Sequence, residues 1–102
     1  MVTPLSLTTD SRDDGSLVLR AKGELDMSNV DAFSEALANA RKAGQDNQLS
    51  VDLSGVDYLD SGAISVLFDH ADGIQIMVNP VLMSVLTISG LTKVATVTPA
   101  SR

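Results

Sequence analysis

Cysteine is absent from this sequence, and histidine and the aromatic residues are rare. Without a thiol, the chain has no disulfide framework, no cysteine-based zinc or iron–sulfur site, no thiol redox motif and no cysteine nucleophile. A single histidine leaves few routes to catalysis. Of the 102 residues, 44% are hydrophobic and 20% are charged, which is typical of a soluble globular domain. We therefore expect one domain over residues 1–102, stable without a metal and without a cofactor.

Basic residues are also scarce. Seven Lys and Arg stand against 13 Asp and Glu, which gives a net charge of −6, and the basic residues are scattered along the chain. A nucleic-acid or anionic membrane surface requires clustered Lys and Arg, so we expect neither partner. The N-terminal MVTPLSLTTD lacks the features of a leader, and no apolar run approaches the ~20 residues that span a bilayer. These features predict a cytoplasmic protein that docks to a basic protein surface.

The start of the chain has the pattern of an antiparallel strand pair. Leu5 and Leu7 alternate with polar residues, and a second alternating segment covers residues 17–22. Between them, residues 13–16 (Asp-Asp-Gly-Ser) have the composition of a hairpin turn. The pattern indicates two strands that bury one face.

A helix is predicted after the Gly-Glu-Leu-Asp segment of residues 23–26. Its buried stripe consists of apolar residues at helical spacing: Val30, Phe33, Leu37 and Ala40. Ser28 and Asp31 form the S-x-x-D pattern that caps a helix N-terminus. Gly44 is expected to end the helix.

Strands and helices alternate through the rest of the chain. The same reasoning predicts a short strand at 49–53, a loop at 54–60, a helix at 61–72, a strand at 74–78, a helix from Asn79-Pro80 to Gly90, and a strand at 94–98. This order predicts an α/β fold. We expect a four- to five-stranded, mostly parallel mixed sheet with an initial antiparallel strand pair and about three packed helices.

The junction between the loop and the second helix (YLDSGA, residues 58–63) is the most distinctive feature. One interpretation is structural, because Asp-Ser before an apolar helical run is ordinary N-capping chemistry. The other is functional, because open α/β sheets place their sites at the carboxyl ends of the strands. Ser61 would then present a hydroxyl at a helix N-terminus, which tolerates added negative charge. The small Gly62 would let another protein approach.

Residues 49–67 (LSVDLSGVDYLDSGAISVL) resemble the signature segment of STAS domains, the family that includes bacterial anti-sigma factor antagonists. In that family, a strand carrying Asp-Leu-Ser leads to a turn whose first serine or threonine is the phosphoacceptor. Two further parts of the chain are similar to the family: residues 23–26, and residues 78–80 together with 89–91. In this order the matching segments span nearly the whole chain.

The resemblance implies a regulatory switch that is not an enzyme. Ser61 would be phosphorylated by a partner anti-sigma factor with serine-kinase activity, and a PP2C-type phosphatase would restore it. The unphosphorylated domain, a monomer or weak dimer, would sequester the anti-sigma factor and free a sigma factor for stress or developmental transcription. The implied partner-binding residues are Asp26, Asp57, Asp60, Gly62, Asn79 and Pro80.

The sequence departs from the family after Ser61. Many members have a second serine and then a glycine, whereas this chain has Gly62 and Ala63. A constitutive STAS-fold scaffold, for instance a subunit of a lipid-transport ATPase complex, therefore remains the main alternative function.

Two other functions fit the serine less well. A hydrolase elbow, G-x-S-x-G, would need glycine at the positions of Leu59 and Ala63, and His70 lies nine residues from Ser61. A carrier protein modified on Ser61 would be a helical bundle, but segments such as residues 49–53 alternate as strands do. The Asp-His-Ala-Asp segment at 69–72 lacks the further ligands that would complete a metal site.

Overall fold

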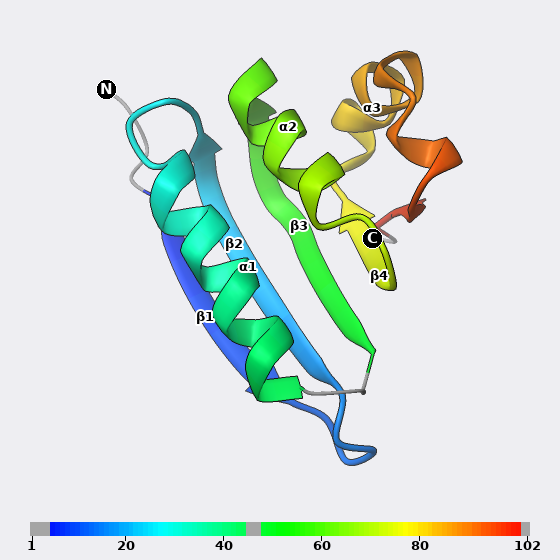
Figure 1. The fold of residues 1–102 in the computed structure, drawn as a ribbon. Coiled ribbons are helices and arrows are strands. Elements are labelled where there is room, and N and C mark those ends of the chain that lie inside the picture. The colour runs from blue at the N-terminus through cyan, green and yellow to red at the C-terminus, as the bar shows by residue number, and fades with distance from the viewer. Residues whose placement is uncertain (1–4, 45–47, 101–102) are drawn as a thin grey trace.

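The computed structural model describes residues 5–44 and 48–100, which form a five-stranded sheet with helices packed on one face (Figure 1). The strands are β1 (Ser6–Ser11), β2 (Leu17–Leu25), β3 (Leu49–Leu59), β4 (Ile74–Val78) and β5 (Thr96–Pro99). The α-helices are α1 (Val30–Gly44), α2 (Ser61–Asp69) and α3 (Met83–Ser89), and the short 3-10 turns are η1 (Pro80–Leu82) and η2 (Leu91–Lys93).

The strand order in the sheet is the same as the order in the chain, β1-β2-β3-β4-β5. β1 and β2 are antiparallel, and the three pairs that follow are parallel. The hairpin turn between β1 and β2 lies where the sequence predicts it. The carboxylate of Asp14 accepts hydrogen bonds from the backbone N–H and the hydroxyl of Ser16, and Gly15 has a φ of 87°. These features confirm the predicted α/β class and mixed sheet.

The hydrophobic core lies between the sheet and its helices. In Figure 1, α1 lies in front of β1 and β2, and α2 lies in front of β3. Phe33 and Leu37 of α1 and Leu67 of α2 are fully buried against the inward residues of the strands. Burial of each such side chain contributes about 1.5–3 kcal/mol, so this single layer holds the helices on the sheet.

β3 is much longer than predicted, and the expected loop at 54–60 is wrong. Its pairing with β2 shifts register twice, between Arg20 and Lys22 and between Gly23 and Glu24. Each shift adds one residue to β3, so buried Val56 and Leu59 are separated by two exposed residues. The two-residue period that marks a strand is therefore lost, although the pairing continues.

The N-terminus of α1 does not use the predicted Ser28–Asp31 cap. The hydroxyl and the backbone N–H of Ser28 both donate to the carboxylate of Asp26. The first turn then begins at Val30, whose N–H donates to the carbonyl oxygen of Asp26. The Ser28 hydroxyl, which the sequence pattern predicts as the helix cap, is thus used in the local turn at Asp26.

α2 ends three residues before the predicted limit at 72. His70 is its C-cap residue, and the backbone then turns through Gly73, which has a φ of 75°. The guanidinium of Arg41 on α1 donates to the carbonyl oxygens of His70, at 2.7 Å, and Asp72. Since these carbonyls have an external donor, the chain can leave the helix early.

The predicted third helix is divided in two. Asn79 caps η1 as expected, since its side chain accepts from the N–H of Val81 at 3.2 Å, and α3 follows and ends at Gly90 with a φ of 90°. Residues 91–93 form η2, so β5 begins at Thr96 and not at 94. Within residues 5–44 and 48–100, every helix is too short or too polar to cross a membrane.

Candidate functional site

The carboxyl ends of β2 and β3 meet at one edge of the sheet. Leu25 pairs with Leu59, and the N–H of Asp60 donates to the carbonyl oxygen of Leu25 at 3.1 Å. Asp26 and the Asp60-Ser61 pair therefore follow directly from two neighbouring strand ends. We call this region, comprising Asp26, Met27, Asp57, Tyr58, Asp60, Ser61 and Gly62, the acidic edge.

Ser61 is the first residue of α2, and its side chain is exposed. The N-cap of the helix is Asp60, which has extended backbone angles and accepts the N–H of Ala63 on its carboxylate at 2.9 Å. The structural interpretation of the Asp-Ser pair therefore applies to Asp60 and not to Ser61. Within residues 5–44 and 48–100 the Ser61 hydroxyl makes no hydrogen bond, so it is exposed and is not used to cap the helix.

Gly62 leaves the turn between Asp60 and α2 without a side chain at this position. A Cβ at position 62 would lie 3.3 Å from the Asp60 carboxylate oxygen that caps the helix, which is tighter than an ordinary contact. Any larger residue would crowd the cap and would also stand beside the Ser61 hydroxyl. Glycine therefore leaves both groups accessible.

Asp26 is fixed by a network in the loop before α1. Its carboxylate accepts the hydroxyl of Ser28 at 2.5 Å and the Ser28 N–H at 2.9 Å, and these hydrogen bonds lower the pKa of Asp26. The Asn29 side chain accepts from the N–H of Asp26 at 3.0 Å and donates to the carbonyl oxygen of Glu24 at 2.8 Å. The loop holds a charged carboxylate next to Met27, which is 85% exposed.

Asp57 lies at the second register shift of β3. It is the extra residue between the Gly23–Val56 and Glu24–Tyr58 pairs, and it is exposed, as is Tyr58. The shift thus presents a carboxylate and an aromatic ring beside the end of β2. A regularly alternating strand would have turned one of these two neighbouring side chains inward, so their joint exposure depends on the register shift.

Asn79 and Pro80 lie apart from the other predicted residues. They follow β4, whose last residue, Val78, pairs with Leu53 of β3. Residues 54–59 of β3 extend beyond that pair before Ser61 is reached, and because of the two register shifts they run beside only about four residues of β2, a rise of about 13 Å. Asn79 and Pro80 share the carboxyl end of the sheet with Ser61, while Asp26 and Asp60 are its close neighbours.

The acidic edge keeps its negative charge. Among residues 5–44 and 48–100, both recorded ion pairs belong to Arg20, which contacts Asp10 and Asp52 on the helix-free face of the sheet. The carboxylates of Asp26 and Asp60 are instead satisfied by uncharged donors. The edge can therefore attract a cationic surface.

His70 lies at the opposite end of α2 from Ser61. A nine-residue helix is about 13 Å long, so the imidazole cannot take a proton from the Ser61 hydroxyl. The geometry fits a serine that is modified by another protein better than a serine nucleophile.

Comparison with known proteins identifies the family. The family model described as "Mlab, STAS domain" matches residues 8–98. The chain belongs to the STAS domain family. A search of curated proteins finds no match.

Solved structures share this STAS fold. An anti-sigma factor antagonist from Mycobacterium paratuberculosis superposes with a TM-score of 0.84 at 22% identity, covering 95% of this chain and 87% of that one. The anti-sigma factor antagonist SpoIIAA in its unphosphorylated form gives 0.71 at 17% identity, covering 95% and 90%. The Bacillus cell fate determinant SpoIIAA in its phosphorylated form gives 0.67 at 17% identity, covering 95% and 93%. At these identities the likeness establishes the fold.

Proposed function

We propose that this STAS domain is an anti-sigma factor antagonist. It binds an anti-sigma factor with serine-kinase activity in the cytoplasm, which frees a sigma factor for transcription. Phosphorylation of Ser61 by that partner ends the interaction, and a PP2C-type phosphatase restores it. The observation that carries the proposal is the exposed Ser61 hydroxyl, which is free because Asp60 caps the helix.

The acidic edge has the composition of a protein-binding surface. Asp26, Asp57 and Asp60 supply negative charge, while Met27 and Tyr58 add exposed apolar area between them. Aromatic residues and Met are enriched in interface cores, and complementary charge steers the encounter. The matching partner surface is basic and holds an apolar depression. We propose that Asn79 and Pro80 contact the periphery of the same partner.

A phosphate on Ser61 would act across the interface and not on the fold. It adds about −1.5 to −2 charges beside Asp60 and Asp57. The N-terminus of α2 favours negative charge, so the domain itself tolerates the group. In the complex, like-charge contact and desolvation weaken binding, and ~2–3 kcal/mol corresponds to roughly 30- to 150-fold.

The experiment is recovery of partners from the native cytosol on immobilised wild type and three variants. Ser61→Ala is expected to retain a kinase-type anti-sigma factor, and Ser61→Glu to retain much less of it. Ser65→Ala is the matched control, because Ser65 is also an exposed serine of α2. Mass spectrometry of the wild type is expected to find phosphate on Ser61. Equal retention by wild type and Ser61→Glu would contradict the switch.

A second candidate function is the constitutive scaffold of a lipid-transport ATPase complex. Two observations favour it: the turn after Ser61 is Gly62-Ala63 and has no adjacent hydroxyl, and the matching family model is described by the name Mlab and not as an antagonist. The same experiment separates the candidates. A transporter ATPase recovered equally with Ser61→Ala and Ser61→Glu would support the scaffold. The third candidate, a carrier protein, is excluded because carrier proteins are helical bundles and this chain forms a five-stranded sheet.

A further inference from the structure

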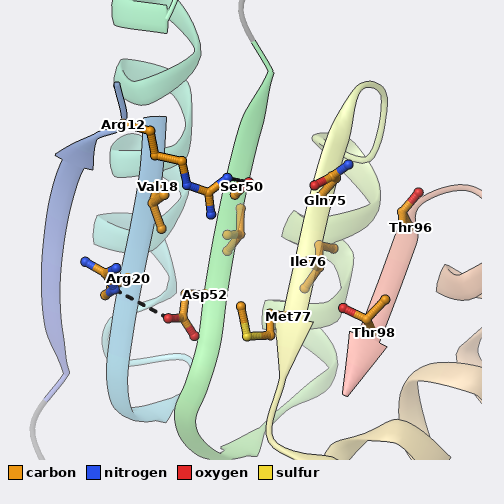
Figure 2. A pocket seen from close by; sticks show the side chains of 11 residues that line it. Arg12, Val18, Arg20, Ser50, Asp52, Gln75, Ile76, Met77, Thr96 and Thr98 are labelled. Atoms are coloured by element: carbon orange, nitrogen blue, oxygen red, sulfur yellow. Dashed lines mark hydrogen bonds and ion pairs between the residues drawn. The ribbon is translucent and has the colours of Figure 1, made fainter. Parts of the chain in front are cut away.

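The helix-free face of the sheet contains a hollow of about 280 Å³ that spans β2 to β5 (Figure 2). Its position follows from two rows of side chains that the strand register places across the sheet. The first row is Val18, Ser50, Gln75 and Thr96, and the second is Arg20, Asp52, Met77 and Thr98. Adjacent strands are about 4.8 Å apart, so each row presents four neighbouring side chains to the same volume.

The floor of the hollow is apolar. Val18 is only 4% exposed although no described helix covers this face, so the apolar area open to a ligand is that of Met77, which is 37% exposed and lies diagonally from Val18 across β3. A methionine sulfur makes favourable contacts with aromatic rings. Gln75 of β4 and Thr96 and Thr98 of β5 line one side of the hollow with amide and hydroxyl groups that can donate or accept hydrogen bonds. The site therefore suits a flat, partly apolar molecule with polar substituents.

The charges in the hollow differ in how far they are neutralised. Arg20 lies 3.4 Å from the Asp52 carboxylate and also contacts Asp10, so its charge is balanced. The other oxygen of Asp52 accepts the N–H and the hydroxyl of Ser54. Arg12 reaches from the hairpin to the hydroxyl of Ser50 at 3.3 Å, and it has no ion pair recorded among the described residues. The charge of Arg12 also acts on the Asp14 carboxylate of the hairpin, but without an ion pair it is the less neutralised of the two arginines that line the hollow.

We propose that this hollow binds a small aromatic carboxylate of one or two rings. The guanidinium of Arg12 pairs with the carboxylate, and the rings lie on the exposed part of Met77. The volume supports this size, since a cavity of about 150 Å³ accommodates one benzene ring. A monoanion is favoured over a dianion because, of the two cations that line the hollow, only Arg12 is outside an ion pair, and the two carboxylates held by Arg20 would repel a second negative charge.

The test is a ¹H–¹⁵N NMR titration of the whole chain with 2-naphthoate. We expect saturable shifts by about 1 mM, concentrated at the amides of the two rows. Neutral 2-naphthamide has the same rings and is expected to bind about tenfold more weakly, because it lacks the charge-assisted hydrogen bonds. 2-Naphthyl phosphate, a dianion near neutral pH, is also expected to bind more weakly than the carboxylate. No saturable shift, or shifts centred on α2, would overturn the proposal.

Two variants locate the charge that recognises the ligand. Arg12→Gln is expected to weaken 2-naphthoate about tenfold and to leave 2-naphthamide unchanged. Lys42→Gln removes the same charge from an exposed position on α1 and is expected to leave both affinities unchanged. The spectra themselves report whether each variant is folded. Equal loss of 2-naphthoate affinity in both variants would mean that net charge, and not Arg12, governs binding, and would refute the site.

Discussion

The carboxylates of the sheet face and those of the acidic edge are satisfied in different ways. Asp10 and Asp52 on the face share the guanidinium of Arg20, so each of them contacts a cation and their combined negative charge is halved. Asp26 and Asp60 at the edge accept hydrogen bonds from uncharged hydroxyl and N–H donors. Both sets accept hydrogen bonds or ion pairs, but among the described residues only the carboxylates of the face contact a cation. Hydrogen bonding and ion pairing are therefore independent properties, and the carboxylates of the edge have the first without the second.

The largest effect on stability is expected from Arg20→Met, which removes both ion pairs on the helix-free face of the sheet. Arg20 has 45% of its side chain exposed, but Asp52 has only 17%, so the substitution leaves a partly buried carboxylate without its cation. We expect a loss of about 1–3 kcal/mol in the free energy of unfolding at neutral pH, measured by urea titration. Arg12→Gln, which breaks no recorded ion pair, is the control and should cost less than about 0.5 kcal/mol. Equal losses would mean that the Arg20 pairs contribute nothing specific.

A smaller effect on stability is expected at the acidic edge. There the hydrogen bond that Asp60 accepts, and not its negative charge, stabilises the fold. Asp60→Ala removes the acceptor for the N–H of Ala63 and should cost about 1 kcal/mol. Asp60→Asn keeps an acceptor oxygen and should retain most of that stability in the same urea titration. If Asp60→Asn were as destabilising as Asp60→Ala, Asp60 would stabilise the fold through its charge. The edge would then not differ from the face in this respect.

Acid should weaken both regions. Hydrogen bonds from Ser28 lower the pKa of Asp26. Burial opposes the charged form of Asp52, but the Ser54 hydrogen bonds and the charge of Arg20 outweigh it and lower its pKa from the usual 3.8. Carboxylates with depressed pKa values stabilise the folded state above about pH 4, and this stabilisation is lost as the pH falls through the folded-state pKa.

The Ser54→Ala variant tests the part of this acid dependence that belongs to the face. It removes one donor to Asp52, so the pKa of Asp52 should move toward its usual value and the free energy of unfolding should fall less steeply below pH 4. Ser65→Ala, on the exposed surface of α2, should keep the wild-type dependence. An unchanged slope in Ser54→Ala would show that the hydroxyl does not hold the charge of Asp52.

The smallest effect on stability is expected from Ser61→Glu. A negative charge in the first turn of a helix is favourable by about 0.3–1 kcal/mol, so the variant should be as stable as the wild type or slightly more stable. Ser65→Glu places the same charge one turn further along α2 and should gain less. Thermal unfolding of the two variants measures the difference. A clear loss of stability in Ser61→Glu would mean that phosphate acts by disrupting α2 and not by repelling a partner.

Most of the fold could be predicted from the sequence because local patterns and tertiary contacts agree. The alternation at 17–22 and 74–78 and the helical spacing of Phe33 and Leu37 all mark residues that the core buries. The exceptions arise where a distant contact decides. Pairing with β2 keeps β3 extended through two register shifts. Arg41 donates hydrogen bonds that allow α2 to end early.

The site could be predicted only in part for the same reason. The Asp60-Ser61 junction has a local capping pattern that can be read from the chain, although the sequence did not show which residue caps α2. Met27 and Tyr58 were missed because their exposure depends on the loop network and the second register shift. The hollow was missed because its residues come from four strands and are aligned only by register.

The order of the strands also determines the order in which these regions can form. Because each strand pairs with the strand before it in the chain, the sheet can grow from β1 by adding one neighbour at a time. The acidic edge needs only β2, β3 and the helices that follow them, and so it is complete once residue 69 has folded. The hollow needs β4 and β5 as well. Fraying of the short last strand would therefore open the hollow at Thr96 and Thr98 while leaving Ser61 in place.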